Sequence, residues 1–169
     1  MRKNYILFFI FSAVLVFVDQ ITKVAAASAL KSGGQFIVID GFLRFKYLEN
    51  RGAAWGMMQG AGIFFIILTI VIMALVVYFV SRIPKGSRYV PMLIFSMLLF
   101  AGGLGNLIDR IGLRYVRDFI DFYGVGFPVF NVADVCVSVA VIMLVILVIF
   151  VYREKDYEAL KKKKKDGTK

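Results

Sequence analysis

Residues 105–134 contain three polar stretches, GNLIDR at 105–110, RDFID at 117–121 and FNVAD at 130–134, between two strongly apolar segments. These stretches carry four carboxylates, those of Asp109, Asp118, Asp121 and Asp134. A charged group at the centre of a bilayer costs about 3 kcal/mol on insertion scales, so carboxylates where a membrane surface meets a buried cavity indicate a functional site. We take Asp118 and Asp134 as the candidate acid/base pair.

The composition is that of an integral membrane protein. Of the 169 residues, 60% are hydrophobic, which is far above the average for soluble domains. This length allows one domain, so we expect a single membrane domain over residues 1–169.

The net charge of +10 has a local cause and does not predict a nucleic-acid partner. A polar tail at 153–169 follows the last apolar segment and contains five consecutive lysines at 161–165. Such a tail marks the cytosolic side of a membrane, and its lysines can contact anionic lipid.

The residue types that are missing narrow the possible chemistry. The sequence has no histidine and one cysteine, Cys136. An intrachain disulfide is therefore impossible, and nucleophile–histidine dyads and the common zinc motifs are excluded. If the chain is an enzyme, carboxylates must do the work, and we expect neither a metal nor a cofactor.

Four apolar segments are long enough to cross a bilayer. We place them at residues 5–28, 61–80, 90–108 and 130–152. The basic residues near the N-terminus, the apolar run at 5–18 and the alanines at 25–27 would also fit a cleaved signal peptide. Asp19, Gln20 and Lys23 interrupt that region, which favours a first membrane helix.

The first loop, at 29–60, predicts a small β-hairpin. Residues 36–39 and 42–47 flank Asp40-Gly41, a favoured two-residue turn, and apolar and basic residues alternate in the second segment. We expect a sheet with one apolar face, lying on the membrane surface. After it come Asn50, which is either a substrate ligand or an ordinary turn residue, and an interfacial aromatic, Trp55.

Helical spacing pairs several polar residues. Asp19 and Lys23 are i, i+4, which fits either a salt bridge near the interface or the lining of a polar cavity. Asp109 is unfavourable at a helix C-terminus, so it should have a specific partner. Asn131 and Asp134 are i, i+3, the spacing of a helix N-cap and its acidic N3 residue as well as that of a site.

The distribution of basic residues predicts the orientation of the chain in the membrane. Basic residues are concentrated in the N-terminal flank, in the loop after the second span and in the tail, which places both termini in the cytosol. The second outer loop is then 109–129. Six polar residues consequently reach the extracytoplasmic level together: Asp19, Asn50, Asn106, Arg110, Asp118 and Asp134.

Five short motifs carry a resemblance over nearly the whole chain. They are DQITK at 19–23, NRGAAW at 50–55, GNLIDR at 105–110, DFI at 118–120 and FNVAD at 130–134. In this order, with four spans, they resemble the bacterial lipoprotein signal peptidases, or type II signal peptidases. The resemblance implies an all-α polytopic membrane protein with four transmembrane helices and a small extracytoplasmic β-hairpin or sheet.

The resemblance also implies residue roles. The two catalytic aspartates of this family of membrane aspartyl proteases correspond to Asp118 and Asp134, and Asp121 is the less favoured alternative. The matching active-site and supporting positions are Asn50, Gly52, Asn106, Arg110, Asn131, Asp19, Lys23 and Asp109. One departure is Arg117, where the family usually has an aliphatic residue; its guanidinium either lowers the pKa of Asp118 or points to water.

The implied substrate is a prolipoprotein whose cysteine carries diacylglycerol and which is cut just before that cysteine. The implied location is the bacterial cytoplasmic (inner) membrane, with the site near the extracytoplasmic face and no obligate protein partner. Independently of the family, two close carboxylates share one proton and can activate water.

Two other classes of protein remain possible. In a proton-coupled transporter the buried aspartates would be relay groups, but no internal repeat or broken helix pair is evident. In an assembly factor the polar residues would only fix helix packing.

Overall fold

The computed structural model describes residues 2–52 and 61–162. Its main elements are α1 (Arg2–Leu30), β1 (Gln35–Ile39), β2 (Leu43–Asn50), α2 (Gly62–Arg82), α3 (Val90–Leu113), β3 (Val116–Asp121), α4 (Val132–Ile146) and α5 (Glu154–Lys162). Short 3-10 turns lie at Ser87–Tyr89 and Tyr123–Val125, and a π-helical turn at Leu147–Val151 continues α4. The expectations for Trp55 and for the side chains of the lysine run lie outside what is described.

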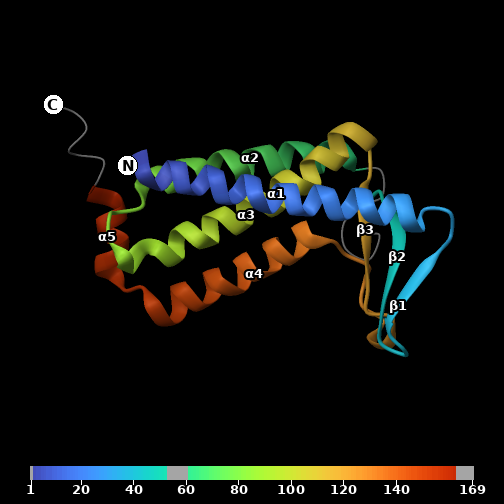
Figure 1. Ribbon diagram of the computed structural model, residues 1–169. Coiled ribbons are helices and arrows are strands. Elements are labelled where there is room, and N and C mark those ends of the chain that lie inside the picture. The colour runs from blue at the N-terminus through green and yellow to red at the C-terminus, as the bar shows by residue number, and fades with distance from the viewer. Residues whose placement is uncertain (1, 53–60, 163–169) are drawn as a thin grey trace.

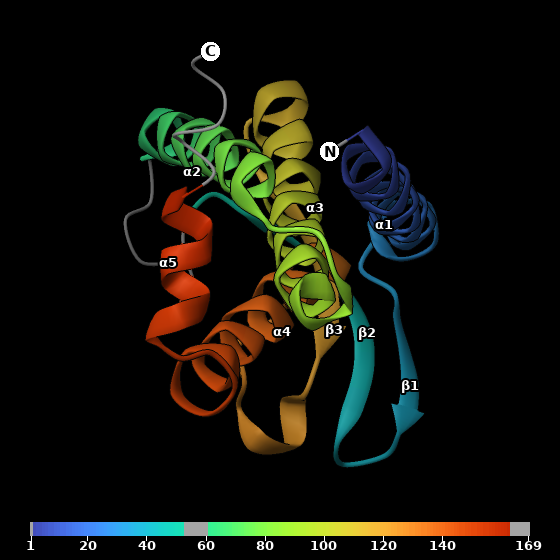
Figure 2. The same cartoon turned by 90° about the vertical axis from the view of Figure 1, so that its left-hand side faces the viewer.

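Four helices are long and apolar enough to cross a membrane, as expected. They cover Tyr5–Leu30, Gly62–Arg82, Ser87–Leu113 and Val132–Val151. They run side by side, with the sheet at one end and α5 at the other (Figure 1). In the end-on view α3 lies among α1, α2 and α4 (Figure 2). Half of the α3 span is buried, against 11–17% in the other three, so α3 is the central helix.

Two glycines let the other helices approach α3 closely. A Cβ at Gly102 would lie 2.5 Å from the carbonyl oxygen of Ala133 in α4. A Cβ at Gly105 would lie 2.5 Å from Oδ2 of Asp19 in α1. The small-residue pattern at 101–105 therefore brings the polar parts of α1 and α4 against one level of α3.

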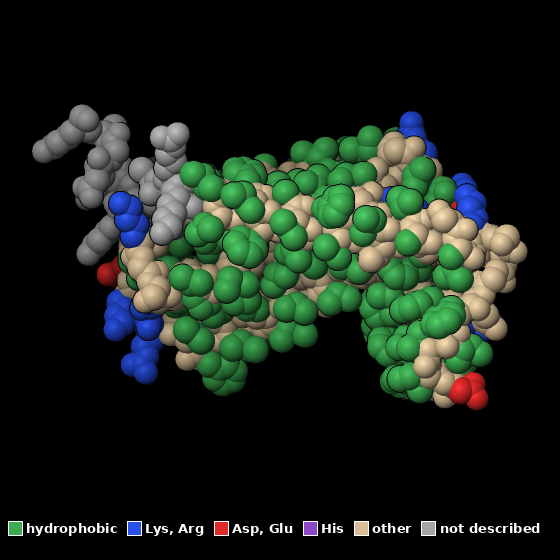
Figure 3. All heavy atoms as spheres, viewed as in Figure 1, with side chains coloured by type: hydrophobic (Ala, Val, Ile, Leu, Met, Phe, Trp, Pro, Cys, Tyr) green, Lys and Arg blue, Asp and Glu red, His purple; other side chains and the backbone are tan. Residues whose placement is uncertain are grey.

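The apolar core fills the opposite end of the bundle. Phe8, Val80, Met92 and Leu147 are buried there, and Tyr157 of α5 packs against them. The outward surfaces of the membrane helices are covered with exposed apolar side chains (Figure 3). That exposure fits helices whose outer solvent is lipid.

The sheet has the order β1-β2-β3, and both pairs are antiparallel. The predicted hairpin is present, since Phe36 pairs with Phe45 and Ile39 with Leu43. The third strand was not predicted; it places Asp118 opposite Leu48 of β2. All five residues of β1 are exposed, including four consecutive apolar ones, so both faces of that strand are apolar and not one as expected.

One predicted boundary differs from the structure. Asp109 and Arg110 belong to α3 and not to the loop expected at 109–129, because α3 continues to Leu113 and ends at Arg114, whose φ of 70° is left-handed. In its described part, the basic tail expected at 153–169 contains α5, and Asp156 of this helix accepts two hydrogen bonds of 2.6 Å from Arg88.

Candidate active site

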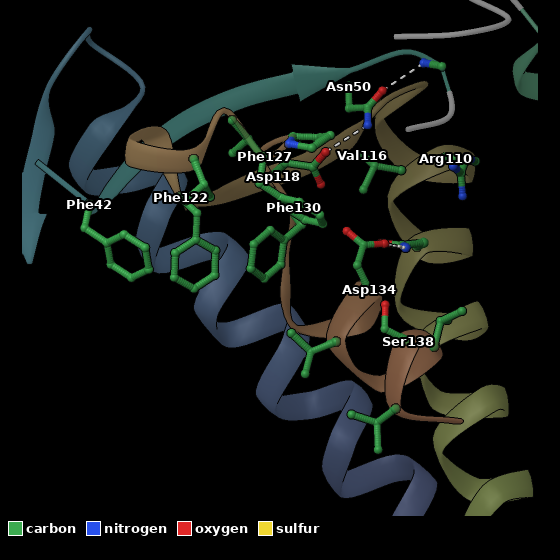
Figure 4. Close-up of a pocket in the computed structure, with 18 residues that line it drawn as sticks. Phe42, Asn50, Arg110, Val116, Asp118, Phe122, Phe127, Phe130, Asp134 and Ser138 are labelled. Atoms are coloured by element: carbon green, nitrogen blue, oxygen red, sulfur yellow. Dashed lines mark hydrogen bonds between the residues drawn. The ribbon is translucent and has the colours of Figure 1, made fainter. Parts of the chain in front are cut away.

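A cavity of about 690 Å³ opens where the sheet overhangs the start of α4. The space-filling view shows the hollow between the overhanging sheet and the bundle (Figure 3). Most of its wall is apolar, with Phe42, Phe122, Phe127 and Phe130 among the lining residues (Figure 4). Its polar wall is formed by Asn50, Asn106, Arg110, Asp118 and Asp134.

Asp118 enters the cavity from β3 and is 1% exposed. Its Oδ2 accepts a hydrogen bond of 2.9 Å from Nδ2 of Asn50, at the end of β2. Its Oδ1 accepts one of 2.6 Å from Nδ2 of Asn131. Burial, followed by the charge of Asp134, raises the pKa of Asp118 to about 7, although both amide donors favour its ionised form. This carboxyl can therefore hold or release a proton near neutral pH.

Asp134 enters from the first turn of α4. Its Oδ1 accepts a hydrogen bond of 2.8 Å from Nδ2 of Asn106 in α3. Its Oδ2 accepts one of 3.1 Å from the backbone N–H of Asn131. In return, the backbone N–H of Asp134 donates to Oδ1 of Asn131 over 3.0 Å, which completes a capping box.

The two interpretations of Asn131 and Asp134 are thus compatible. The oxygen of the Asn131 side chain caps α4, and its nitrogen donates to Asp118 and, over 3.2 Å, to Asn106. Asn131 is fully buried, and it donates to both carboxylates, to that of Asp118 from its side-chain nitrogen and to that of Asp134 from its backbone N–H. Figure 4 shows Asp118 and Asp134 on the same side of the cavity, from β3 and α4 respectively.

A second polar layer lies behind the cavity wall. Lys23 Nζ is 2.9 Å from Asp19 and 2.9 Å from Oδ1 of Asn106, and it is fully buried. Asp19 also accepts a hydrogen bond of 2.8 Å from the backbone N–H of Ala133 in α4. The predicted i, i+4 pair therefore exists as a buried salt bridge, and neither of its residues lines the cavity.

Asp109 has the specific partner that its unfavourable helix position predicted. Arg117 donates to its two oxygens over 2.6 and 3.1 Å, and the backbone N–H of Arg117 donates over 2.9 Å. Lys23 Nζ is 3.7 Å away. Arg117 also donates to Oε1 of Gln20, and its side chain is 12% exposed, so of the two alternatives for this residue, the one in which it points to water is wrong.

Of the remaining candidate site residues, Arg110 and Gly52 lie at the cavity and Asp121 lies outside it. Arg110 lines the cavity, with its guanidinium 5.2 Å from the centre of the Phe65 ring. The backbone N–H of Gly52 donates to Oδ1 of Asn50, which fixes that amide so that its nitrogen faces Asp118. Asp121 pairs with Arg44 on the sheet over 2.7 Å and does not line the cavity.

Sequence reasoning missed two contributors. Gln20, inside the first motif, donates to Asp19 and to the carbonyl of Gly105. Ser138 lines the cavity one helical turn after Asp134, a position that the i, i+4 spacing could have indicated. Among the described residues, no group of three His, Cys, Asp or Glu side chains comes together to hold a metal ion.

This fold and this cavity define a multi-pass membrane enzyme, and two solved bacterial membrane enzyme structures share the architecture. One has a TM-score of 0.75 at 40% identity, covering 83% of this chain and 86% of that one. The other has a TM-score of 0.74 at 39% identity, covering 86% and 94%.

Sequence comparison then gives the family. The pattern described as Signal peptidase (SPase) II matches residues 11–150. A lipoprotein signal peptidase of Caldanaerobacter subterraneus is 45% identical over 139 residues, 82% of this chain and 92% of the relative. One of Staphylococcus aureus is 41% identical over 153 residues, 86% and 91%. The chain belongs to the signal peptidase II family of membrane proteases.

Proposed function

We propose that this chain cleaves diacylglyceryl-modified prolipoproteins just before the lipidated cysteine, with Asp118 and Asp134 as its catalytic residues. Membership of the family supports removal of signal peptides from prolipoproteins. The observation that carries the proposed mechanism is the pair of carboxylates in one cavity, both accepting hydrogen bonds from Asn131, with the pKa of Asp118 raised to about 7.

The chemistry follows from one proton shared by two carboxylates. The ionised carboxylate takes a proton from a water molecule while the oxygen of that water attacks the scissile carbonyl carbon. The protonated carboxyl donates a hydrogen bond to the carbonyl oxygen. When the tetrahedral intermediate collapses, the C–N bond breaks and the leaving amine takes a proton from the pair, which returns to its initial charge.

Fixed donors keep the two carboxylates in place through this cycle. The amide nitrogens of Asn50 and Asn131 face Asp118, and that of Asn106 faces Asp134. Their own oxygens are occupied by other partners, so the amides cannot turn without breaking a hydrogen bond. Arg110, on the same wall, supplies positive charge for the oxyanion that develops.

The shape of the cavity suits a lipidated peptide. Its phenylalanine and valine wall can take the apolar part of the signal peptide while the acyl chains stay in lipid. The distribution of basic residues supports a site at the extracytoplasmic face of the bacterial cytoplasmic membrane, with both termini and the lysine-rich tail in the cytosol, next to anionic lipid.

The test is cleavage of a synthetic diacylglyceryl-modified lipobox peptide by purified protein. Asp118→Asn and Asp134→Asn, each checked for folding, should lose turnover, and the unlipidated peptide should stay uncut. Asp121→Asn is the matched control, since Asp121 lies on the same strand, pairs with Arg44 and is outside the cavity. Undiminished cleavage by either folded variant would remove that aspartate from the mechanism.

A further inference from the structure

Arg117 precedes Asp118 in β3, and the alternation of a strand sends the two side chains to opposite faces of the sheet. Its guanidinium points away from the cavity and joins three elements. It donates to Asp109 of α3 with two nitrogens and to Gln20 of α1. Arg117 thereby ties the strand that carries Asp118 to two membrane helices.

These contacts satisfy Asp109 almost completely. The carboxylate of Asp109 is fully buried and accepts three hydrogen bonds, all from Arg117. Lys23 remains 3.7 Å from it and instead lies 2.9 Å from both Asp19 and Asn106. Without Arg117, Lys23 would be the nearest cation for a buried carboxylate, and an unpaired buried charge is strongly unfavourable.

The position of Lys23 sets the orientation of Asn106. An ammonium group only donates hydrogen bonds, so the amide oxygen of Asn106 must face Lys23. Its amide nitrogen is then turned toward Asp134, to which it donates over 2.8 Å. If Lys23 moved toward Asp109, the oxygen of this amide would lose the shorter of its two donors and keep only Nδ2 of Asn131, at 3.2 Å, so the orientation of the amide would be less firmly fixed.

We propose that Arg117 is a positioning residue for the two aspartates: by occupying Asp109 it leaves Lys23 on Asn106, which keeps a donor on Asp134. The inference rests on the proposed function, because it assigns Arg117 a role in the same site. Arg117 does not line the cavity, so we do not count it as a catalytic residue.

The charges around Arg117 also support a role for it in the protonation of Asp118. The buried Lys23 and the partly buried Arg117 pair with two buried carboxylates, Asp19 and Asp109, so this layer is neutral. Tyr47 of β2 also faces Arg117, and Arg110 faces the two aspartates from the cavity side. Removing the charge of Arg117 leaves the layer at −1 behind the aspartates, and negative charge favours the protonated form of Asp118.

The test compares Arg117→Met, which keeps the length of the side chain without its charge, with Arg117→Gln and Arg117→Lys. Arg114→Gln is the control, since Arg114 is exposed and three residues away. Two quantities are measured against pH: kcat/KM for the lipidated peptide, and the infrared carbonyl band of protonated Asp118, assigned with Asp118→Asn.

We expect both titrations to move to higher pH by about half a unit to one unit in Arg117→Met and Arg117→Gln. In Arg117→Lys the shift should be less than half as large, and in Arg114→Gln it should be absent. If Arg117→Met does not fold, the comparison rests on Arg117→Gln. Unshifted titrations in the folded neutral variants, or an equal shift in Arg114→Gln, would overturn the assignment.

The two proposals fail in different ways. If wild-type protein does not cleave the peptide, the proposed function fails, while the infrared titration of Asp118 still tests Arg117. If wild type cleaves and the neutral variants titrate as wild type does, the proposed function stands and Arg117 is only structural.

Discussion

Asn131 performs two tasks with the two ends of one amide. Its oxygen caps α4 and its nitrogen donates to Asp118. Serine can keep the first task, since its hydroxyl accepts a hydrogen bond at an N-cap, but it is too short for the second. We expect Asn131→Ser to retain about 1 kcal/mol more stability than Asn131→Ala.

Activity should separate from stability in this pair of variants. Both lose the donor to Asp118, so both should lose about a hundredfold in kcat/KM. Thermal unfolding and peptide cleavage, measured on the same preparations, check the two effects. Near-wild-type cleavage by Asn131→Ser would mean that capping alone explains why Asn131 is buried beside the aspartates.

The environment of Asp118, including the amide of Asn50, predicts how kcat/KM changes at alkaline pH. Because the pKa of Asp118 is about 7, the shared proton is lost as the pH rises through 7, and kcat/KM should fall there. The amide of Asn50 stabilises the ionised carboxylate, so Asn50→Ala should raise the pKa of Asp118 and move the fall to higher pH. A pH series of kcat/KM for both proteins checks this, and a shift to lower pH would contradict it.

At the scale of residues, the sequence could predict pairs that lie close along one helix. Asp19 with Lys23, and Asn131 with Asp134, follow from i, i+4 and i, i+3 spacing. The contacts of Arg117 could not be predicted in the same way, because its partners Gln20 and Asp109 come from two other elements. Their meeting depends on how a strand docks on two helices, which no local pattern encodes.

At the scale of elements, close helix packing around α3 depends on Gly105. A Cβ at this position would meet Oδ2 of Asp19 at 2.5 Å and Cβ of Ala133 at 3.1 Å. Both neighbours are fixed by hydrogen bonds, so Gly105→Ala should force α1 and α4 apart and destabilise the protein by about 1–3 kcal/mol. It should also lower cleavage, because Asp19 anchors the start of α4.

Gly103 on the same helix is the matched control. The nearest atoms to its added Cβ are side-chain carbons of Thr69 and Met73 at 3.5 and 3.7 Å, which is ordinary contact. Gly103→Ala should therefore be neutral or slightly stabilising, since alanine favours the helix. Equal melting temperatures for the two variants would show that the approach of α1 and α4 to Gly105 is not limiting.

The elements themselves were predictable to different degrees. Length and hydropathy suffice for the four membrane helices, and Asp40-Gly41 for the hairpin. β3 escaped prediction because it pairs with β2, whose Leu48 lies 70 residues before Asp118 (118 − 48), so its pairing is not local. Its residues also show no simple alternation of burial, since Asp118 and Phe119 are both buried.

At the scale of the whole molecule, two regions with polar contacts, one around the cavity near the sheet and one around α5, lie at opposite ends of the bundle (Figure 1). At one end is the cavity. At the other, Asp156 of α5 accepts both bonds from Arg88, beside the stacked rings of Tyr89 and Tyr152. Tyr152 lies eighteen positions after Asp134 along α4 and its π-helical turn, which is about 27 Å at ~1.5 Å per residue. Two members of the second region, Tyr152 and Asp156, lie beyond residues 11–150, which match the family.

This separation predicts that α5 can be loosened without loss of activity. In the wild type, the hydrogen bonds from the Arg88 guanidinium hold the pKa of Asp156 well below its usual range, so this ion pair is present throughout neutral pH. Arg88→Gln removes the charge that forms it. We expect the amides of α5 to exchange several-fold faster in the variant, with kcat/KM unchanged. Lys85→Gln, which removes an exposed charge from the same loop, should alter neither quantity. A parallel loss of cleavage in Arg88→Gln would show instead that the two ends of the bundle are coupled through α3 and α4, and that α5 helps to hold the aspartates in place.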